Sequence, residues 1–402
     1  MKLLYIANIR LPTERAHGVQ IVQNCEAFAA AGAEVTLWIA RRFQTAELRD
    51  VQDVWAHYGV ARRFGIRRLP CLDLLPLVPE RSDGLAKAVF GLQLLTFTLS
   101  AFLGALFSRA DIFYSRDPLI LLCLSLIKPR GRLAYEAHLL AQGRVGRWVE
   151  RQVLRRVNTV FTTTRHLADT LIERGAQPDR THPAHDGIRA ERFAGPLTVA
   201  AARAKIGLTT PGFVVGYVGR FQTMALDKGV GLLVEAAARV EGLTVMLVGG
   251  PAEIAEGFQA EWTARGCVPE RFFAPGQVTP EAVPQYLYAC DVLAIPSPPG
   301  EWFAYHSSPM KLFEYMAAKR SLLASDLPAL REVVDERSAV LLPPQDVAAW
   351  ADALQRLRDD PALRESLAET AHALVMREYT WESRTRMILS ALGGADAGGG
   401  RP

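Results

Sequence analysis

Short runs of apolar residues alternate with amphipathic stretches along most of the chain. In the first half, strands are expected at 2–8, 34–40, 111–115, 133–136 and 159–163. The second half repeats the alternation, with strands expected at 213–218, 243–248, near Phe272, and at 292–295, 322–324 and 339–342. Strands separated by helices are typical of parallel sheets built from right-handed β–α–β crossovers. The pattern therefore predicts an α/β protein with two parallel sheets.

The two alternations are separated by a linker region at 196–211, which is bounded by prolines. A chain of 402 residues is also too long for one hydrophobic core and suits two domains. We expect a first domain at 1–195, a second at 196–380, a C-terminal helix at 381–392 that crosses back to the first domain, and a disordered Gly-rich tail at 393–402. Pockets favour domain interfaces, so a ligand site is expected in a cleft between the domains.

One segment, 88–107, contains twenty residues without a charge and is long enough to span a bilayer. Its apolar character is interrupted by Gln93, Thr96, Thr98 and Ser100. A strand of the first sheet follows at once, so a span here would split one sheet across a membrane. We favour a buried helix, and a helix that touches a membrane surface is the main alternative.

Charge is unevenly distributed. Residues 1–195 contain 27 Lys and Arg against 18 Asp and Glu, whereas the whole chain contains 46 and 42. One row of arginines shares a face of a helix expected at 146–158, namely Arg144, Arg147, Arg151 and Arg155. Such a row is either a solvated helix face or a surface that docks on anionic lipid. The basic residues are otherwise scattered and no nucleic-acid-binding module occurs, so an anionic membrane surface or a phosphorylated acceptor fits better than nucleic acid.

The five cysteines form no C-x-x-C pair, which favours a reducing compartment without disulfides. The apolar run at the N-terminus is short and is soon followed by Arg10 and Glu14, so it resembles a strand more than a signal peptide. We therefore expect a cytoplasmic protein, which the arginine row would allow to bind the inner face of the cell membrane. No D-x-D pair occurs, so we expect no tightly held metal, and no motif calls for a cofactor.

The candidate site with the most chemistry begins where the strand at 292–295 ends. A Pro- and Gly-broken loop follows, and Ser307, Ser308 and Pro309 are suited to the cap and first turn of a helix expected at 310–318. The N-terminus of a helix at the carboxyl end of a parallel strand presents N–H groups to a ligand. The site therefore suits a phosphate.

Two charged residues on that helix, Lys311 and Glu314, lie one turn apart and can share a face. A cation for phosphate and a carboxylate for hydroxyl groups fit a nucleoside diphosphate with its ribose. An ordinary surface ion pair would show the same spacing, so this stretch alone leaves both interpretations open.

Further candidates follow other strands at their carboxyl ends: Gly18, His138, Arg220, Lys228 and Gly249. This edge is where open parallel sheets bind ligands. Glycine lets a backbone approach a phosphate closely, and histidine can exchange a proton near neutral pH. Taken singly, each has an ordinary alternative, such as a turn glycine or a hydrogen-bonded loop histidine.

In combination, the motifs resemble those of the retaining nucleotide-sugar glycosyltransferases with the GT-B fold, the group 1 family. The matching segments of the second half are Y-V-G-R-F at 217–221 with D-K-G at 227–229, L-V-G-G at 247–250, Q-Y-L-Y-A-C-D-V-L-A-I-P-S at 285–297, and K-L-F-E-Y-M-A-A at 311–318. The first half matches more faintly, through His17-Gly18, His138 and A-H-D-G-I-R-A-E-R-F at 184–193. The resemblance implies two Rossmann-like domains whose parallel sheets face an inter-domain cleft.

The resemblance also assigns roles in donor binding. Arg220 and Lys228 would hold the donor diphosphate, whose negative charge grows as the sugar departs, so that both cations favour the transition state. Glu314 would accept hydrogen bonds from the ribose. The helix start at Ser307 and Ser308 would add N–H donors to phosphate. Gly249, His306 and Lys311 complete the implied donor site.

In the first domain, Gly18 would let the domain close onto the phosphate, and His138 would contact the sugar or position the acceptor hydroxyl. The sequence departs from the family pattern at three positions: Arg189 stands where an Asp is common, Asp186 stands where an Asn is usual, and the third concerns the donor helix. The family usually has two glutamates eight positions apart, but His306 stands where the partner of Glu314 is expected. Either His306 itself or Glu301 in the preceding loop would then contact the sugar hydroxyls.

The implied reaction moves a sugar from a nucleoside-diphosphate sugar to an acceptor hydroxyl, with retention at the anomeric carbon and without a metal ion. The acceptor would be a glycan, a glycolipid or a small molecule, and cell-envelope or other glycan synthesis is the expected setting. Two alternatives are kept open: a nucleotide-sugar epimerase of the same fold, and a non-catalytic homologue that acts as a partner protein.

Overall fold

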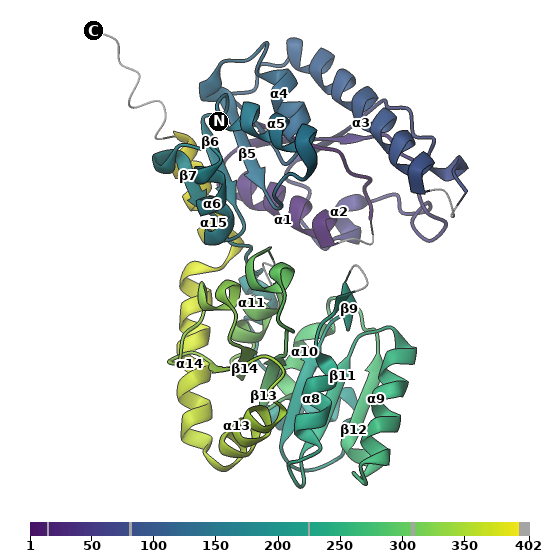
Figure 1. Ribbon diagram of the computed structural model, residues 1–402, viewed down its shortest axis with the longest axis vertical. Coiled ribbons are helices and arrows are strands. Elements are labelled where there is room, and N and C mark those ends of the chain that lie inside the picture. The colour runs from purple at the N-terminus through teal and green to yellow at the C-terminus, as the bar shows by residue number, and fades with distance from the viewer. Residues whose placement is uncertain (14–15, 80–82, 224–225, 307–309, 394–402) are drawn as a thin grey trace. The chain divides into compact units, whose positions relative to one another are not determined.

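The computed structural model describes residues 1–13, 16–79, 83–223, 226–306 and 310–393 (Figure 1). The chain divides into two compact units. Unit 1 comprises Met1–His185 together with the segment from Trp381 onward, and unit 2 comprises Asp186–Thr380. The division after His185 precedes the boundary that the sequence analysis places at residue 195.

Unit 1 contains a seven-stranded sheet in the order β3-β2-β1-β4-β5-β6-β7, and each neighbouring pair is parallel. The strands are β1 (Lys2–Ala7), β2 (Glu34–Ala40), β3 (Gly65–Leu69), β4 (Ile112–Ser115), β5 (Leu133–Ala137), β6 (Thr159–Thr162) and β7 (Thr181–Pro183). The direction of winding reverses between β1 and β4, so a crevice is expected outside the carboxyl ends of these two strands. The sequence analysis missed the two edge strands, because β3 carries exposed arginines and β7 has only three residues.

Helices cover both faces of this sheet. One face packs against α1 (Ala16–Ala30), α2 (Val54–His57) and α15 (Trp381–Gly393). The other packs against α3 (Asp83–Leu106), α4 (Pro118–Leu124), α5 (Gly143–Leu154) and α6 (Arg165–Glu173). Unit 1 therefore has two cores, one on each side of a sheet whose central strands are buried.

Helix α3 corrects one expectation, because it is not a buried helix. Phe97, Ala101 and Ala105 pack against the sheet, but Leu95 and Leu99 on the opposite side are 59% and 58% exposed. In the described residues α3 is the one helix long and apolar enough to cross a membrane, yet only 28% of its most apolar window is buried. The expected segment 88–107 overlaps this helix, which begins five residues earlier at Asp83, and the apolar pattern did not reveal that its outer side is exposed.

Unit 2 contains a six-stranded parallel sheet in the order β12-β11-β8-β13-β14-β15. Its strands are β8 (Val214–Val218), β11 (Thr244–Val248), β12 (Phe272–Gly276), β13 (Val292–Ile295), β14 (Ser321–Ser325) and β15 (Val340–Leu342). A small antiparallel pair that the sequence analysis did not foresee, β9 (Gln222–Thr223) with β10 (Leu226–Asp227), follows β8. The switch in strand order lies between β8 and β13, which places a second crevice at their carboxyl ends.

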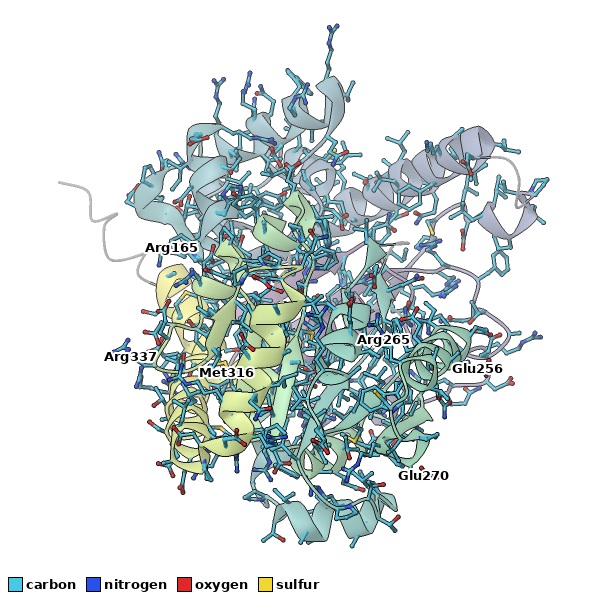
Figure 2. The ribbon with its side chains drawn as sticks, turned by 60° about the horizontal axis from the view of Figure 1, so that its bottom comes forward. Arg165, Glu256, Arg265, Glu270, Met316 and Arg337 are labelled. Atoms are coloured by element: carbon cyan, nitrogen blue, oxygen red, sulfur yellow. The ribbon has the colours of Figure 1, made fainter. Side chains whose placement is uncertain are left out.

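The helices of unit 2 also form two layers. One layer contains α8 (Val230–Ala237), α9 (Ala252–Ala264) and α13 (Val347–Asp359). The other contains α7 (Val199–Ile206), α10 (Val283–Ala289), α11 (Met310–Ala317), α12 (Pro328–Arg331) and α14 (Pro361–Glu378). Figure 2 labels residues of both kinds: Met316 of α11 is fully buried, whereas Arg337 and Glu256 are exposed.

Short helices complete the chain: the 3-10 turns η1 (Leu75–Leu77), η2 (Arg130–Arg132), η3 (Pro178–Arg180), η4 (Ala190–Phe193) and η5 (Pro269–Arg271), and the π-helical turn η6 (Trp302–His306). The π-helical turn lies in the loop between β13 and α11. Single π-helical turns occur often at functional sites.

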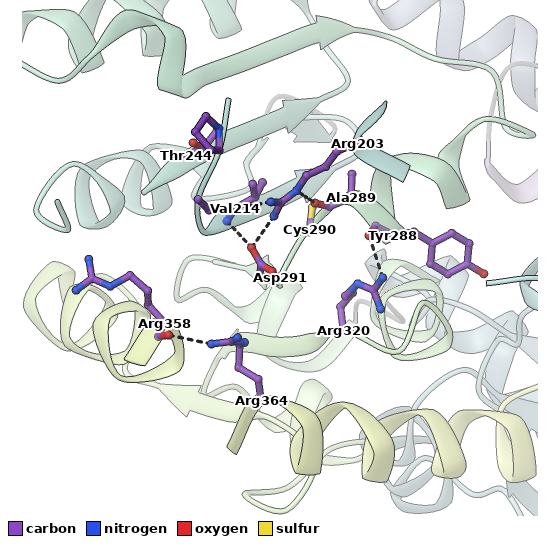
Figure 3. Close-up of polar contacts among 12 residues, drawn as sticks. Arg203, Val214, Thr244, Tyr288, Ala289, Cys290, Asp291, Arg320, Arg358 and Arg364 are labelled. Carbon is purple, nitrogen blue, oxygen red and sulfur yellow. Dashed lines mark hydrogen bonds and ion pairs between the residues drawn. The ribbon is translucent and has the colours of Figure 1, made fainter. Parts of the chain in front are cut away.

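The amino edge of the unit 2 sheet is fixed by arginines (Figure 3). Asp291, just before β13, accepts hydrogen bonds from Arg203 and from the Val214 amide, both at 2.7 Å. Arg203 also donates to the Ala289 carbonyl at 2.9 Å, and Arg320 donates to the Tyr288 carbonyl at 2.9 Å. Arg203 thus ties α7, within the expected linker, to two strand starts. These arginines stabilise the amino edge of the sheet, which is opposite to the crevice.

Candidate functional site

In unit 2, three cations meet at the carboxyl end of β8. Arg220 follows this strand directly, Lys228 follows β10, and Lys311 lies in the first turn of α11. The Lys311 ammonium lies 3.9 Å from the centroid of the Tyr217 ring. It donates to the Tyr217 hydroxyl and, at 3.4 Å, to the Arg220 carbonyl. The structure therefore brings together all three cations that the sequence analysis predicted for a diphosphate.

The electrostatics of this cluster favour an anion. Burial lowers the pKa of Lys311 well below its ordinary value, and the nearby Lys228 lowers it further, against the opposite effect of Glu314. Burial and the neighbouring Arg220 likewise lower the pKa of Lys228. These half-buried lysines are disfavoured in their charged form by burial and by neighbouring cations. A bound anion would offset this effect, because an opposite charge nearby favours the charged form.

Two glycines make room for this cluster. Gly219 has a φ of +142°, and a Cβ there would lie 2.0 Å from the Lys311 Cε. Gly249 has a φ of +144°, and its Cβ would lie 2.1 Å from the Gly219 carbonyl oxygen. The Gly219 amide donates to Val248 and the Gly249 amide to Gly276, so both N–H groups are used within the fold. The predicted residue Gly249 therefore contributes close packing rather than an N–H donor.

Glu314 lies one turn beyond Lys311 on the same helix and is half-buried. Burial raises the pKa of its carboxyl group, while Arg192 and Lys311 act in the opposite direction. The Arg192 guanidinium lies 3.9 Å from the Glu314 carboxylate. Sequence reasoning missed Arg192 as a partner, although it lies in the segment 184–193 that carried the resemblance.

Part of the predicted donor site falls outside the described structure. Ser307 and Ser308 lie outside the described residues, and so does the side chain of His306. Glu301 is exposed at the start of the same loop. The choice between His306 and Glu301 as the contact to the sugar therefore stays a prediction.

In unit 1, a pocket of about 630 Å³ opens at the carboxyl ends of β1, β4 and β5. Its polar lining residues follow these strands or β2, or begin α1, and include Asn8, Arg10, His17, Arg42, Arg116, Asp117 and His138. The predicted residue His138 thus lines the pocket. Gly18 does not: a Cβ there would lie 2.4 Å from the Thr13 Cγ2 and 2.8 Å from the Tyr58 hydroxyl. In the structure, packing explains this glycine.

His138 is held by a buried carboxylate that sequence reasoning missed. Glu136 is fully buried on β5, and one of its oxygens lies 2.8 Å from the His138 Nε2. The same oxygen accepts hydrogen bonds from Arg116 at 3.1 Å and from Arg384 at 2.7 Å. Burial alone would raise the pKa of Glu136, but Arg116, Arg384 and His138 together hold it well below its usual range. The available signal was a carboxylate inside an apolar strand, which requires buried partners.

Two family models match the chain. The model described as "Glycosyl transferase 4-like domain" matches residues 16–187, and the model described as "Glycosyl transferases group 1" matches residues 212–360. The first begins after β1 and covers β4, β5 and the pocket residues from His17 onward, and the second covers the cation cluster of unit 2. The second model thus includes the whole cation cluster, and the first includes most of the unit 1 pocket.

Similar curated proteins include D-inositol 3-phosphate glycosyltransferase of Mycobacteroides abscessus, which is 31% identical over 254 residues, covering 62% of this chain and 54% of that protein. Alpha-D-kanosaminyltransferase of Streptomyces kanamyceticus is 28% identical over 246 residues, covering 59% of this chain and 60% of that protein. The chain thus spans a little over half the length of these curated relatives.

Solved structures with the same fold include sucrose-phosphate synthase from Thermosynechococcus elongatus, with a TM-score of 0.75 and 21% identity over 99% of this chain and all of that one. The HepE protein of Anabaena, in complex with UDP-glucose, has a TM-score of 0.68 and 17% identity over 98% of this chain and all of that one. Together with the parallel sheets of seven and six strands, these likenesses show the GT-B fold.

Proposed function

The chain belongs to the group 1 glycosyltransferases, and we propose that it transfers a sugar from a nucleoside-diphosphate sugar to an acceptor hydroxyl. The observation that carries this proposal is the cluster of Arg220, Lys228 and Lys311 at the carboxyl end of β8. A diphosphate is an anion of matching size and charge. The complex of HepE with UDP-glucose supports a donor of this class.

The cation cluster would act on the leaving group. As the bond between the anomeric carbon and the phosphate oxygen breaks, negative charge grows on the diphosphate. Preorganised cations, of which Lys228 and Lys311 are half-buried, stabilise this growing charge more than they stabilise the ground state. Glu314, one turn along α11, would accept hydrogen bonds from the ribose hydroxyls, which fixes the nucleoside relative to its phosphates.

We propose retention at the anomeric carbon and a reaction without a metal ion, as the family resemblance implies. In a front-face route, the acceptor oxygen bonds to the anomeric carbon on the side from which the phosphate departs. The acceptor hydroxyl proton passes to the departing phosphate oxygen, so no enzyme nucleophile is needed. His138, whose Nε2 is held by Glu136, would contact the sugar or position the acceptor hydroxyl.

We further propose that the pocket of unit 1 takes the acceptor. Arginine and histidine side chains line it beside Asn8 and Asp117, and this mixture suits a hydroxyl-bearing or anionic group. Glycan, glycolipid and small-molecule acceptors all offer such groups. The proposed setting is glycan synthesis on the cytoplasmic side of the cell membrane.

A thermal-shift experiment tests the donor site. UDP, GDP, ADP and TDP are added to the wild type and to Arg220→Ala and Lys311→Met. One nucleotide should raise the melting temperature of the wild type, because a ligand at a hundredfold excess over its Kd stabilises the native state by about 2.7 kcal/mol. Both variants should lose most of this shift. Equal shifts in wild type and variants would place the nucleotide elsewhere and contradict the assignment.

Turnover separates transfer from the alternatives. The matching sugar nucleotide is incubated with and without candidate acceptors, and the sugar products are identified. Acceptor-dependent release of nucleoside diphosphate supports a transferase. Interconversion of the donor sugar without an acceptor would instead indicate an epimerase, and binding without any turnover would indicate a partner protein.

A further inference from the structure

Helix α3 is longer than the sheet on which it lies. Its 24 residues extend about 36 Å at 1.5 Å per residue, whereas β1 has six residues and extends about 20 Å. The centre and end of α3 pack against the sheet through Phe97, Ala101 and Ala105. Its beginning therefore extends beyond the carboxyl edge of the sheet, where the pocket of unit 1 opens.

The outward face of α3 is a stripe of leucines. Leu85, Leu92, Leu95, Leu99, Leu103 and Leu106 follow one another at spacings of three, four or seven residues, and each is exposed. These spacings place all six on one side of the helix. A helix that is apolar on its outer face as well as its inner face is typical of a buried or membrane-bound position, and in the described residues no segment of unit 1 covers this side.

Basic residues and a tryptophan lie in the same helix layer. Helix α4 packs against both α3 and α5, and all three helices belong to one face of the sheet (Figure 1). Helix α5 exposes Trp148 and Val145 beside Arg144, Arg147 and Arg151. Exposed tryptophan next to cations is the composition of an interface between lipid and water, where anionic headgroups attract the charges.

Helix α3 also borders the acceptor pocket. Phe90 of α3 and Leu75 of η1 are among its apolar lining residues, and Arg10 and His138 are among its polar ones. Gln93 of α3 exchanges two amide hydrogen bonds with Asn8, at 2.8 and 3.0 Å, and Asn8 lines the pocket too. The position of α3 is thereby tied to the pocket: the face of this helix that carries Phe90 borders the pocket, and the leucine stripe lies on its outer side.

We propose that the leucine stripe of α3, assisted by the basic end of α5, docks on an anionic phospholipid bilayer, and that the unit 1 pocket takes the head group of an acceptor lipid in that bilayer. The second part rests on the proposed function. An amphipathic surface helix lies in the plane of the interface with its apolar face among the acyl chains. The cations that line the pocket favour an anionic, hydroxyl-bearing head group, and the lipid tail would stay beside α3.

Vesicle sedimentation tests the docking. The protein is mixed with phosphatidylcholine vesicles that contain or lack phosphatidylglycerol, and the bound fraction is measured at low and high salt. Wild type should bind the anionic vesicles. The variant Leu95→Gln/Leu99→Gln/Leu103→Gln should bind about tenfold or more weakly, because glutamine keeps the helix but removes the apolar contact. Val268→Gln, which changes an exposed apolar residue of unit 2, is the control and should bind as wild type does.

Two further measurements place the surface. Arg144→Gln/Arg147→Gln/Arg151→Gln should lose the preference for anionic vesicles but keep weak binding to neutral ones. Brominated acyl chains should quench the fluorescence of the wild type, and Trp148→Phe should lose most of that quenching. Equal vesicle binding by wild type and the leucine variant would overturn the proposal, as would a failure of wild type to bind anionic vesicles.

The nucleotide thermal shift separates this inference from the proposed function. The leucine and arginine variants should keep the shift, since none of these residues belongs to the donor site. Vesicle binding without a nucleotide shift would contradict the donor assignment and leave the docking intact. Dimers that dissociate in the leucine variant, measured by analytical ultracentrifugation without lipid, would show that a second copy covers the stripe and would overturn the bilayer as its partner.

Discussion

The side chain of Lys311 occupies space that is available only because residue 219 is a glycine. The ammonium group contacts the Tyr217 ring across the space that a Cβ on Gly219 would fill. A lysine placed in this way is held near the strand end before any ligand arrives. Because the lysine is already in position, little free energy is needed to order it when a ligand binds. The cation cluster can therefore stabilise a departing diphosphate effectively.

Gly219→Ala should therefore remove nucleotide binding. The new methyl group would collide with the Lys311 side chain, and the φ of +142° is strained for alanine. We expect a folded protein whose thermal shift with the preferred nucleotide is largely lost. Gly257→Ala is the matched control, because Gly257 lies on α9 with no atom near the added Cβ. A full shift in Gly219→Ala would mean that Lys311 does not touch the ligand.

The lowered lysine pKa values predict a pH dependence of binding. Burial and neighbouring cations lower the pKa of Lys311 and of Lys228 in the ligand-free protein. A bound diphosphate raises both again, so binding takes up protons wherever these lysines are partly deprotonated. Nucleotide affinity should fall as the pH rises through the lowered pKa. Calorimetry in buffers of different ionisation enthalpy measures the proton uptake, and Lys311→Met should reduce it.

Which residues could be predicted depends on where their partners come from. Arg220 and Lys228 stand next to glycines near strand ends, and Lys311 stands in the first turn of a helix; such local signals can be read from a sequence. Arg192 and Glu136 could not be assigned in the same way, because their partners lie far along the chain. Arg384, for instance, is 248 residues from Glu136. A single sequence shows that a buried carboxylate needs a partner, but it does not show which cation supplies it.

At the scale of elements, alternating apolar runs predicted the buried strands of both sheets. They failed where the pattern was weak, at β3 with its arginines and at the short pair of β9 and β10. They also misplaced α3, because periodicity distinguishes apolar from polar positions but does not reveal whether an apolar face is covered. The C-terminal helix α15 makes a contact that no local pattern could reveal, because its Arg384 donates a hydrogen bond to a strand from the first half of the chain.

The bond between α15 and β5 should contribute strongly to stability. Glu136→Gln leaves the buried Arg384 without its charged partner, and Arg384→Met leaves Glu136 with less compensation. Each should lower the free energy of unfolding by about 3–5 kcal/mol. The double variant should cost clearly less than the sum of the two, because neither charge is then left behind. Urea denaturation measures all three values.

Arg239→Met is the control for that cycle. Arg239 forms an exposed pair with Glu235 one turn away, and loss of such a pair costs at most about 0.5 kcal/mol. The pKa of Glu136 is lowered in the folded protein. The contribution of Glu136 to the free energy of unfolding is therefore fully present above its ordinary pKa and is lost only as the pH falls through the lowered value. Additive effects of Glu136→Gln and Arg384→Met would show that the two side chains do not interact.

At the scale of the whole molecule, the chain consists of two units that each have their own pair of cores. Units built in this way can unfold in separate steps. The cation cluster belongs entirely to unit 2, whereas the acceptor pocket and the leucine stripe of α3 belong to unit 1. Ligands of the two kinds should therefore stabilise different parts of the protein.

Scanning calorimetry of the full chain tests this separation. We expect two transitions, and the preferred nucleoside diphosphate should raise the melting temperature of one of them more than that of the other. Glu136→Gln identifies the transition of unit 1, since this substitution lowers the stability of that unit. The transition that the nucleotide raises should be the one that Glu136→Gln leaves in place, and Lys311→Met should abolish the increase. If the nucleotide instead raised the transition that Glu136→Gln lowers, the donor would bind mainly through unit 1, and the cation cluster at the end of β8 would not be its principal site.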